Sequence, residues 1–118
     1  MKIRITHILI LYLLFTSVMA EVDYESQIQP IFDLRCIDCH GNSAGLNLSS
    51  YENIMMGSNN GNVIIPYDHE SSDLWQRVNS GQMPPGNNDL TNTQVNLIAQ
   101  WIDEGALPVP DCDPELGC

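Results

Sequence analysis

Three residues close together in the chain, Cys36, Cys39 and His40, form the motif Cys-x-x-Cys-His. Two thiols at this spacing lie on one side of a helical turn and can add to the two vinyl groups of a porphyrin. The imidazole that follows can bind the iron from the proximal side. The motif predicts one covalently attached haem c. The other ring nitrogen of His40 should donate to a backbone carbonyl, for which Pro66 is a candidate.

Other interpretations of the two cysteines are weaker but stay open. A thioredoxin-like redox pair needs a strand-to-helix junction in a βαβ unit, whereas a helical pattern precedes Cys36 and no strand pattern follows. A structural zinc site needs four nitrogen or sulfur ligands in close pairs, and Cys112 and Cys118 have the wrong spacing for that site. A simple disulfide is the remaining alternative.

Met83 is the candidate for the second iron ligand, because it lies in a loop stiffened by Pro84 and Pro85. Proline fixes φ and lowers the entropy of the free loop, which favours a weak iron–sulfur bond. His69 is the alternative ligand, although its polar surroundings are typical of a solvated surface histidine. The apolar pair at residues 55–56, both methionines, is expected to fill a core.

The first 20 residues predict export. A basic start is followed by an apolar run over residues 8–15, and Val18 and Ala20 fit a signal peptidase site. The apolar run is shorter than the ~20 residues that span a bilayer. We therefore expect a cleaved signal peptide over residues 1–20, no membrane span after cleavage, and a periplasmic protein.

Acidic residues dominate the charge, with 15 acidic against 4 basic residues and a formal net charge of −11. Loss of residues 1–20 leaves Arg35 and Arg77 as the basic residues. Such a chain does not bind nucleic acid or an anionic membrane surface through its charge. It suits a redox protein partner with a basic docking patch; the alternative is that the acidity serves only solubility.

Helical periodicity and loops rich in glycine and asparagine predict an all-α domain over residues 21–106. The first expected helix covers residues 25–35, with a start or kink at Pro30, and a short helical segment follows at 50–56, capped by Ser49 or Ser50. A third helix is expected to start at Ser71 or Ser72 and to bury Leu74, Trp75 and Val78. The last helix is expected to have a Thr91–Gln94 capping box and an apolar face made of Leu97, Ile98, Trp101 and Ile102. Residues 107–118 form an acidic tail, in which we expect a disulfide between Cys112 and Cys118. An intermolecular bridge is the alternative.

The chain resembles class I cytochrome c and, more narrowly, the planctomycete-type cytochrome c domain family. The segments that carry the resemblance are Ile28-Gln29-Pro30-Ile31-Phe32, the haem motif, Gly45-Leu46-Asn47-Leu48, Val63-Ile64-Ile65-Pro66, Glu70-Ser71-Ser72-Asp73-Leu74, Met83-Pro84-Pro85 and Trp101-Ile102-Asp103-Glu104-Gly105-Ala106. The family often has glycine after the proline of the Val63–Pro66 segment, whereas this chain has Tyr67.

The resemblance covers about residues 24–106 and implies a small helical domain wrapped around one haem. It implies thioether bonds from Cys36 and Cys39, with His40 as proximal ligand and Met83 as distal ligand. With both axial positions filled, we expect a one-electron carrier and not an enzyme. A haem-based gas sensor, in which Met83 dissociates, and an electron-transfer subunit of a larger oxidoreductase complex are the alternatives.

Overall fold

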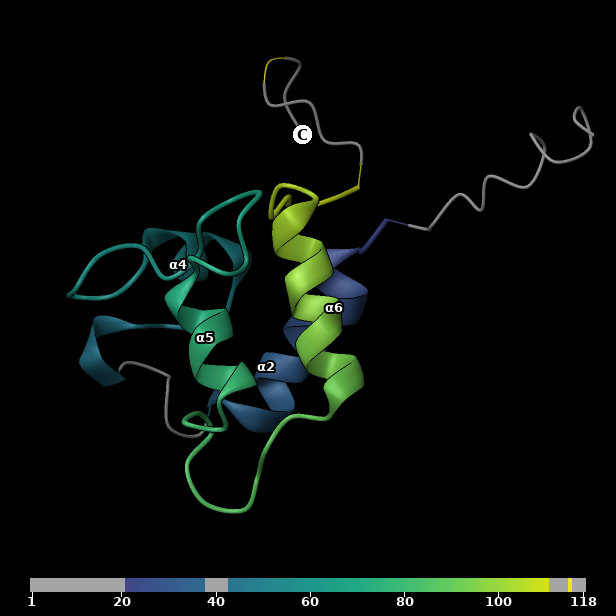
Figure 1. Ribbon diagram of the computed structural model, residues 1–118. Coiled ribbons are helices and arrows are strands. Elements are labelled where there is room, and N and C mark those ends of the chain that lie inside the picture. The colour runs from purple at the N-terminus through teal and green to yellow at the C-terminus, as the bar shows by residue number, and fades with distance from the viewer. Residues whose placement is uncertain (1–20, 38–42, 111–114, 116–118) are drawn as a thin grey trace, which may run out of the picture.

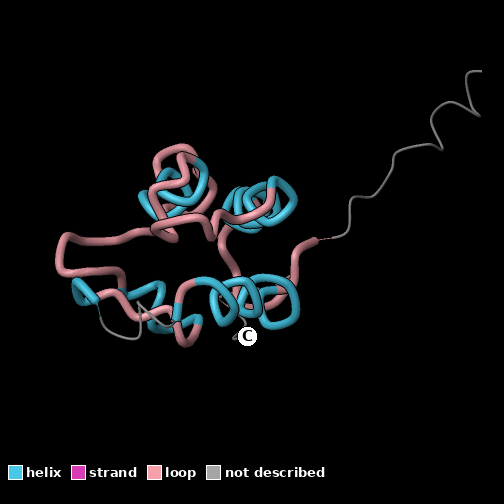
Figure 2. Tube along the Cα trace, turned by 90° about the horizontal axis from the view of Figure 1, so that it is seen from below, coloured by secondary structure: helices cyan, strands magenta, loops and turns pink. Residues whose placement is uncertain are grey.

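The computed structural model describes residues 21–37, 43–110 and 115, and this part of the chain consists of helices joined by loops (Figures 1 and 2). The elements are the π-helical turn η1 (Tyr24–Ile28), α2 (Gln29–Arg35), the 3-10 turn η2 (Ser43–Gly45), α4 (Tyr51–Met56), α5 (Asp73–Asn79) and α6 (Asn92–Asp103). Within the described residues β-pairing is limited to one isolated bridge between Ser58 and Gly61. The predicted all-α class is confirmed. No helix in these residues is long and apolar enough to cross a membrane.

Pro30 decides how the first helical segment is built. It lies in the first turn of α2, where a backbone N–H has no acceptor within the helix, so the lack of an N–H in proline costs no hydrogen bond. The residues before it form the wider turn η1, which begins where the Asp23 carboxylate accepts a hydrogen bond from the backbone N–H of Ser26 at 2.9 Å. Of the two sequence-based alternatives, a start near Pro30 is therefore the observed one, and α2 ends with Cys36 as its C-cap.

The last helix follows its predicted pattern closely. The Thr91 hydroxyl accepts from the backbone N–H of Gln94 at 3.2 Å, and the Gln94 side chain accepts from the N–H of Thr91 at 3.0 Å. This reciprocal capping box fixes the start of α6. The helix buries Val95, Ile98, Trp101 and Ile102, whereas Leu97 is only half-buried.

An aromatic cluster joins η1, α4 and α6. The Tyr24 ring lies 5.1 Å from that of Trp101 and 5.3 Å from that of Tyr51, measured between centroids. Burial raises the pKa of the Tyr24 phenol, so it stays protonated and donates to the Gln29 side chain at 2.7 Å. Gln29 donates in turn to the backbone carbonyl of Leu48 at 3.0 Å. These two hydrogen bonds of Gln29 connect α2 both to the aromatic cluster and to the chain segment that follows η2.

The loop between α4 and α5 contains a left-handed residue where glycine is frequent in the resembling family. Tyr67 has φ of +68°, a conformation that glycine adopts without steric cost. Its backbone N–H donates to the carbonyl of Ile102 at 2.8 Å, which attaches the loop to α6. The departure from glycine therefore changes the residue but leaves a turn that a glycine would suit.

Ser72 precedes α5 but uses its hydroxyl elsewhere. The side chain is fully buried, accepts from the N–H of Ile65 at 2.8 Å, and donates to the carbonyl of Asp68 at 2.9 Å. The predicted start of the helix near Ser71 or Ser72 is confirmed, since Ser72 is the N-cap residue. Its hydroxyl holds the preceding loop instead of capping the helix.

Ser72→Ala is expected to lower the free energy of unfolding by about 1–2 kcal/mol, because two hydrogen bonds to backbone groups are lost at a buried position. Ser71→Ala, at the exposed neighbouring position, should change it by less than about 0.5 kcal/mol. Chemical denaturation of both variants measures the difference. Equal effects of the two substitutions would show that the hydroxyl of Ser72 does not hold the loop.

Candidate haem-binding site

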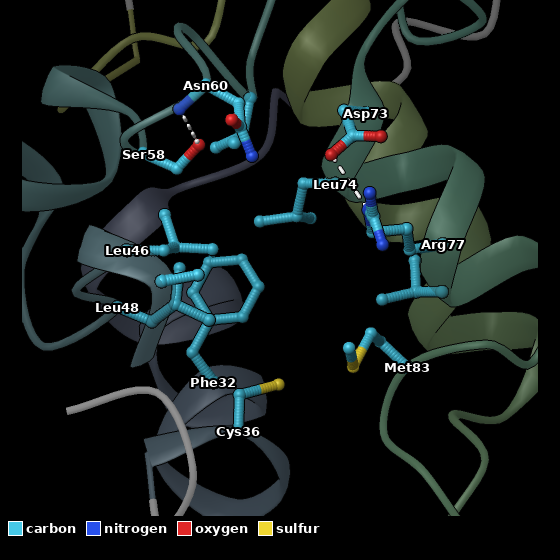
Figure 3. A pocket seen from close by; sticks show the side chains of 13 residues that line it. Phe32, Cys36, Leu46, Leu48, Ser58, Asn60, Asp73, Leu74, Arg77 and Met83 are labelled. Atoms are coloured by element: carbon cyan, nitrogen blue, oxygen red, sulfur yellow. Dashed lines mark hydrogen bonds and ion pairs between the residues drawn. The ribbon is translucent and has the colours of Figure 1, made fainter. Parts of the chain in front are cut away.

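A cavity of about 250 Å³ lies between α2, the segment after η2, and α5 with its following loop. Its walls are largely apolar: Phe32 comes from α2, Leu46 and Leu48 from the segment after η2, and Leu74 and Val78 from α5 (Figure 3). Leu74 and Val78 are four residues apart, so they share one face of their helix. The cavity can therefore accept a molecule with large apolar faces.

Cys36 lines one end of this cavity. Its backbone N–H donates to the carbonyl of Phe32 at 2.9 Å, which continues α2 by one residue. The thiol projects into the cavity (Figure 3). The helix expected over residues 25–35 ends next to the haem motif, and the observed α2 carries Cys36 as its C-cap residue.

Met83 lines the same end from the loop that joins α5 to α6. Its backbone N–H donates to the carbonyl of Arg77 at 3.1 Å, and the N–H of Gly81 donates to that of Val78 at 3.4 Å. Gly81 has φ of +76°, which turns the chain back toward the helix. Figure 3 shows the Met83 side chain directed toward the side on which Cys36 lies. Two sulfur-bearing side chains far apart in the sequence thus share one cavity.

Several predicted groups fall outside the described residues. These are Cys39 and His40 of the haem motif, Cys112 and Cys118 of the tail, and the signal segment 1–20. The expected bond from His40 to the carbonyl of Pro66 and the tail disulfide therefore stay predictions.

His69 differs from its sequence-based interpretation as a solvated surface residue. It is half-buried, its Nδ1 lies 2.7 Å from a carboxylate oxygen of Asp103, and its ring packs edge-on against Trp75 with centroids 4.5 Å apart. This pairing joins the loop before α5 to α6, a contact between distant segments that local polarity does not reveal. His69 is not among the residues that line the cavity.

The methionine pair of α4 was expected to fill a core, and this is wrong for Met56. Met56 is 71% exposed, whereas Met55 is half-buried against the core. Consecutive residues of a helix point in different directions, so a short helix such as α4 buries one of the two and exposes the other. Neither methionine lines the cavity.

The sequence interpretation missed a polar group at the cavity. Ser58, Asn60, Asp73 and Arg77 also line it, and the Arg77 Nε donates to an Asp73 carboxylate oxygen at 2.8 Å (Figure 3). The spacing of four residues on α5 is the signal that predicts this ion pair. Its position at the cavity depends on tertiary structure.

The lining suits a porphyrin better than a bare metal ion. Haem has wide apolar faces, two vinyl groups that accept thiols, and two carboxylates, and the cavity offers apolar walls, a thiol, a thioether and a cationic side chain. Within the described residues, no cluster of three or more His, Cys, Asp or Glu side chains could hold a metal ion. The residues present fit the cofactor that the sequence motif predicts.

Comparison with known protein families gives a match over part of the chain. Residues 36–87, from the first cysteine of the motif to just beyond Met83 and its prolines, match the family described as Planctomycete cytochrome C. The resemblance predicted from the sequence is confirmed over this segment. No curated protein and no solved structure gives a significant match.

Proposed function

We propose, from the match of residues 36–87 to Planctomycete cytochrome C, that the protein is a periplasmic one-electron carrier with a single haem c. The family supports a c-type cytochrome with covalent haem. The observation that carries the finer proposal is that Cys36 and Met83 line one apolar cavity (Figure 3). When bound, the haem supplies an iron that changes between the ferrous and ferric states.

Each site residue has a distinct role in this proposal. Cys36 and Cys39 hold the porphyrin through thioether bonds, and His40 ligates the iron from the proximal side. Met83 ligates it from the distal side, on a loop held by the hydrogen bond from its N–H to the Arg77 carbonyl. Phe32 and the leucines of the wall exclude water, which favours the less charged, reduced centre.

The surface charge supports a role in protein-to-protein electron transfer. The 15 acidic residues all lie outside the proposed signal segment, so the exported protein is strongly anionic. Opposite charge steers two proteins together and raises their association rate. We therefore propose partners with a basic docking patch, and salt should slow the electron exchange with them.

Expression in a host that attaches haem in the periplasm tests the proposal. The purified protein should begin at Glu21, retain haem through a denaturing gel, and contain one haem per chain by its pyridine haemochrome spectrum. A redox titration should follow a one-electron curve. A colourless polypeptide would refute haem attachment, and a protein retained in the cytoplasm would refute the proposed compartment.

A further inference from the structure

The polar side chains of the cavity are grouped at one end. In Figure 3, Cys36 and Met83 lie together at one end, whereas Ser58, Asn60 and the Asp73–Arg77 pair lie toward the other. The apolar walls lie between these two ends. The cavity therefore has a sulfur end and a polar end.

Haem c likewise has one edge that carries the thioether bonds and an opposite edge that carries carboxylates. Its two thioether carbons stand on adjacent pyrrole rings, and its two propionates stand on the other two rings, at the opposite edge. A porphyrin attached through Cys36 at the sulfur end would direct its carboxylates toward the polar end. We propose that Arg77 binds a haem propionate there and that Asp73 positions the guanidinium; this inference rests on the proposed function.

The geometry of Arg77 suits this role. Its Nε–H donates to Asp73 at 2.8 Å, and the guanidinium carries four more N–H donors on its two terminal nitrogens. Arginine binds carboxylates through such paired donors. An Asp73 carboxylate on one side of the fork fixes its plane and leaves the propionate to be bound by the other donors.

The small number of basic residues gives an independent reason to place a haem propionate at Arg77. After residue 20 the chain has no lysine, and its only arginines are Arg35 and Arg77, against 15 acidic residues. Of the two, Arg77 lines the cavity and Arg35 does not. Anionic carboxylates beside low-dielectric walls in an acidic protein need a cation nearby. Arg77 is the basic side chain that the described residues place there.

The backbone of Arg77 adds a connection to the iron ligand. Its carbonyl accepts from the N–H of Met83 at 3.1 Å and from the Ser80 hydroxyl at 3.2 Å. One residue would thus contact the edge of the cofactor with its side chain and the Met83 loop with its backbone. Side-chain substitutions remove the first contact and keep the carbonyl.

The test compares haem-loaded protein with its Arg77→Gln, Arg77→Lys and Asp73→Asn variants. Resonance Raman spectroscopy reports the propionate bending mode, which depends on hydrogen bonding to the carboxylate. Arg77→Gln should shift this band, and Arg77→Lys should shift it less because the charge is kept. Arg77→Gln should also lower the reduction potential, since a positive charge stabilises ferrous iron, whereas Asp73→Asn should raise it.

Arg35→Gln is the matched control, because it removes the same charge from an exposed position outside the cavity. It should leave the propionate band unchanged. An unchanged band in haem-loaded Arg77→Gln would overturn the inference while leaving the carrier function intact. If Arg77→Gln does not mature, an unchanged band in both Arg77→Lys and Asp73→Asn would overturn it equally. Failure of the unmutated protein to bind haem would instead refute the proposed function.

Discussion

Replacing Cys36 and Cys39 together by alanine is expected to abolish covalent haem attachment completely. A thioether bond cannot form without a thiol, and no other described cysteine lines the cavity. The variant should give no haem stain on a denaturing gel and no absorption in the Soret region. Single substitutions should each leave one thioether bond and a reduced yield of haem-loaded protein.

The same double variant should also lose much of its stability. A domain of this size has a small core of its own, and without the porphyrin a cavity of about 250 Å³ remains between α2 and α5. Without the porphyrin the apolar side chains that line this cavity stay exposed to water, and burial of apolar surface is worth about 25 cal/mol per Å². Circular dichroism should show early and broad melting compared with the haem-loaded protein.

A double substitution in the tail provides the control. Cys112→Ser with Cys118→Ser should keep the haem and its spectrum, because the proposed disulfide closes a short loop outside the helical domain. Loss of haem in the tail variant would contradict the proposed boundary between the domain and residues 107–118. Retention of covalent haem in the Cys36/Cys39 variant would contradict the attachment site itself.

The sequence predicts the helices best where a local signal defines their ends. The capping box at Thr91 and Gln94 acts within one helical turn and predicts the start of α6 from neighbouring residues alone, whereas Pro30 leaves a helix start and a kink as alternatives. The π-helical form of η1 was not predicted, since its apolar spacing is close to that of an α-helix. A difference of hydrogen-bond register over a few residues leaves little trace in sequence periodicity.

The residues of the candidate site also differ in whether the local sequence predicts them. Cys36 and Met83 were singled out by their motifs, and the structure brings both to one cavity. The position of Arg77 at that cavity and the His69–Asp103 pair both depend on how distant segments pack. Charge patterns along one helix reveal that Asp73 and Arg77 pair, but they do not reveal what the pair faces. Tertiary packing supplies that information.

Met83→Ala is expected to open the sixth coordination position of the iron. A thioether bound to ferric iron gives a weak charge-transfer band in the near-red, and a filled sixth position blocks carbon monoxide in the ferrous form. The variant should lose the band, bind carbon monoxide fully when reduced, and have a lower reduction potential, because water or hydroxide stabilises ferric iron better than sulfur does.

Two substitutions control for this result. Met56→Ala removes a thioether from a side chain that is 71% exposed and away from the cavity, so all three properties should stay unchanged. His69→Ala should also leave them unchanged, since the His69 ring pairs with Asp103 and packs against Trp75.

If His69→Ala opens the iron while Met83→Ala has no effect, ligation is bis-histidine. If the unmutated protein binds carbon monoxide readily, a gas-binding role replaces that of a carrier, because an electron carrier of this type keeps both axial positions filled.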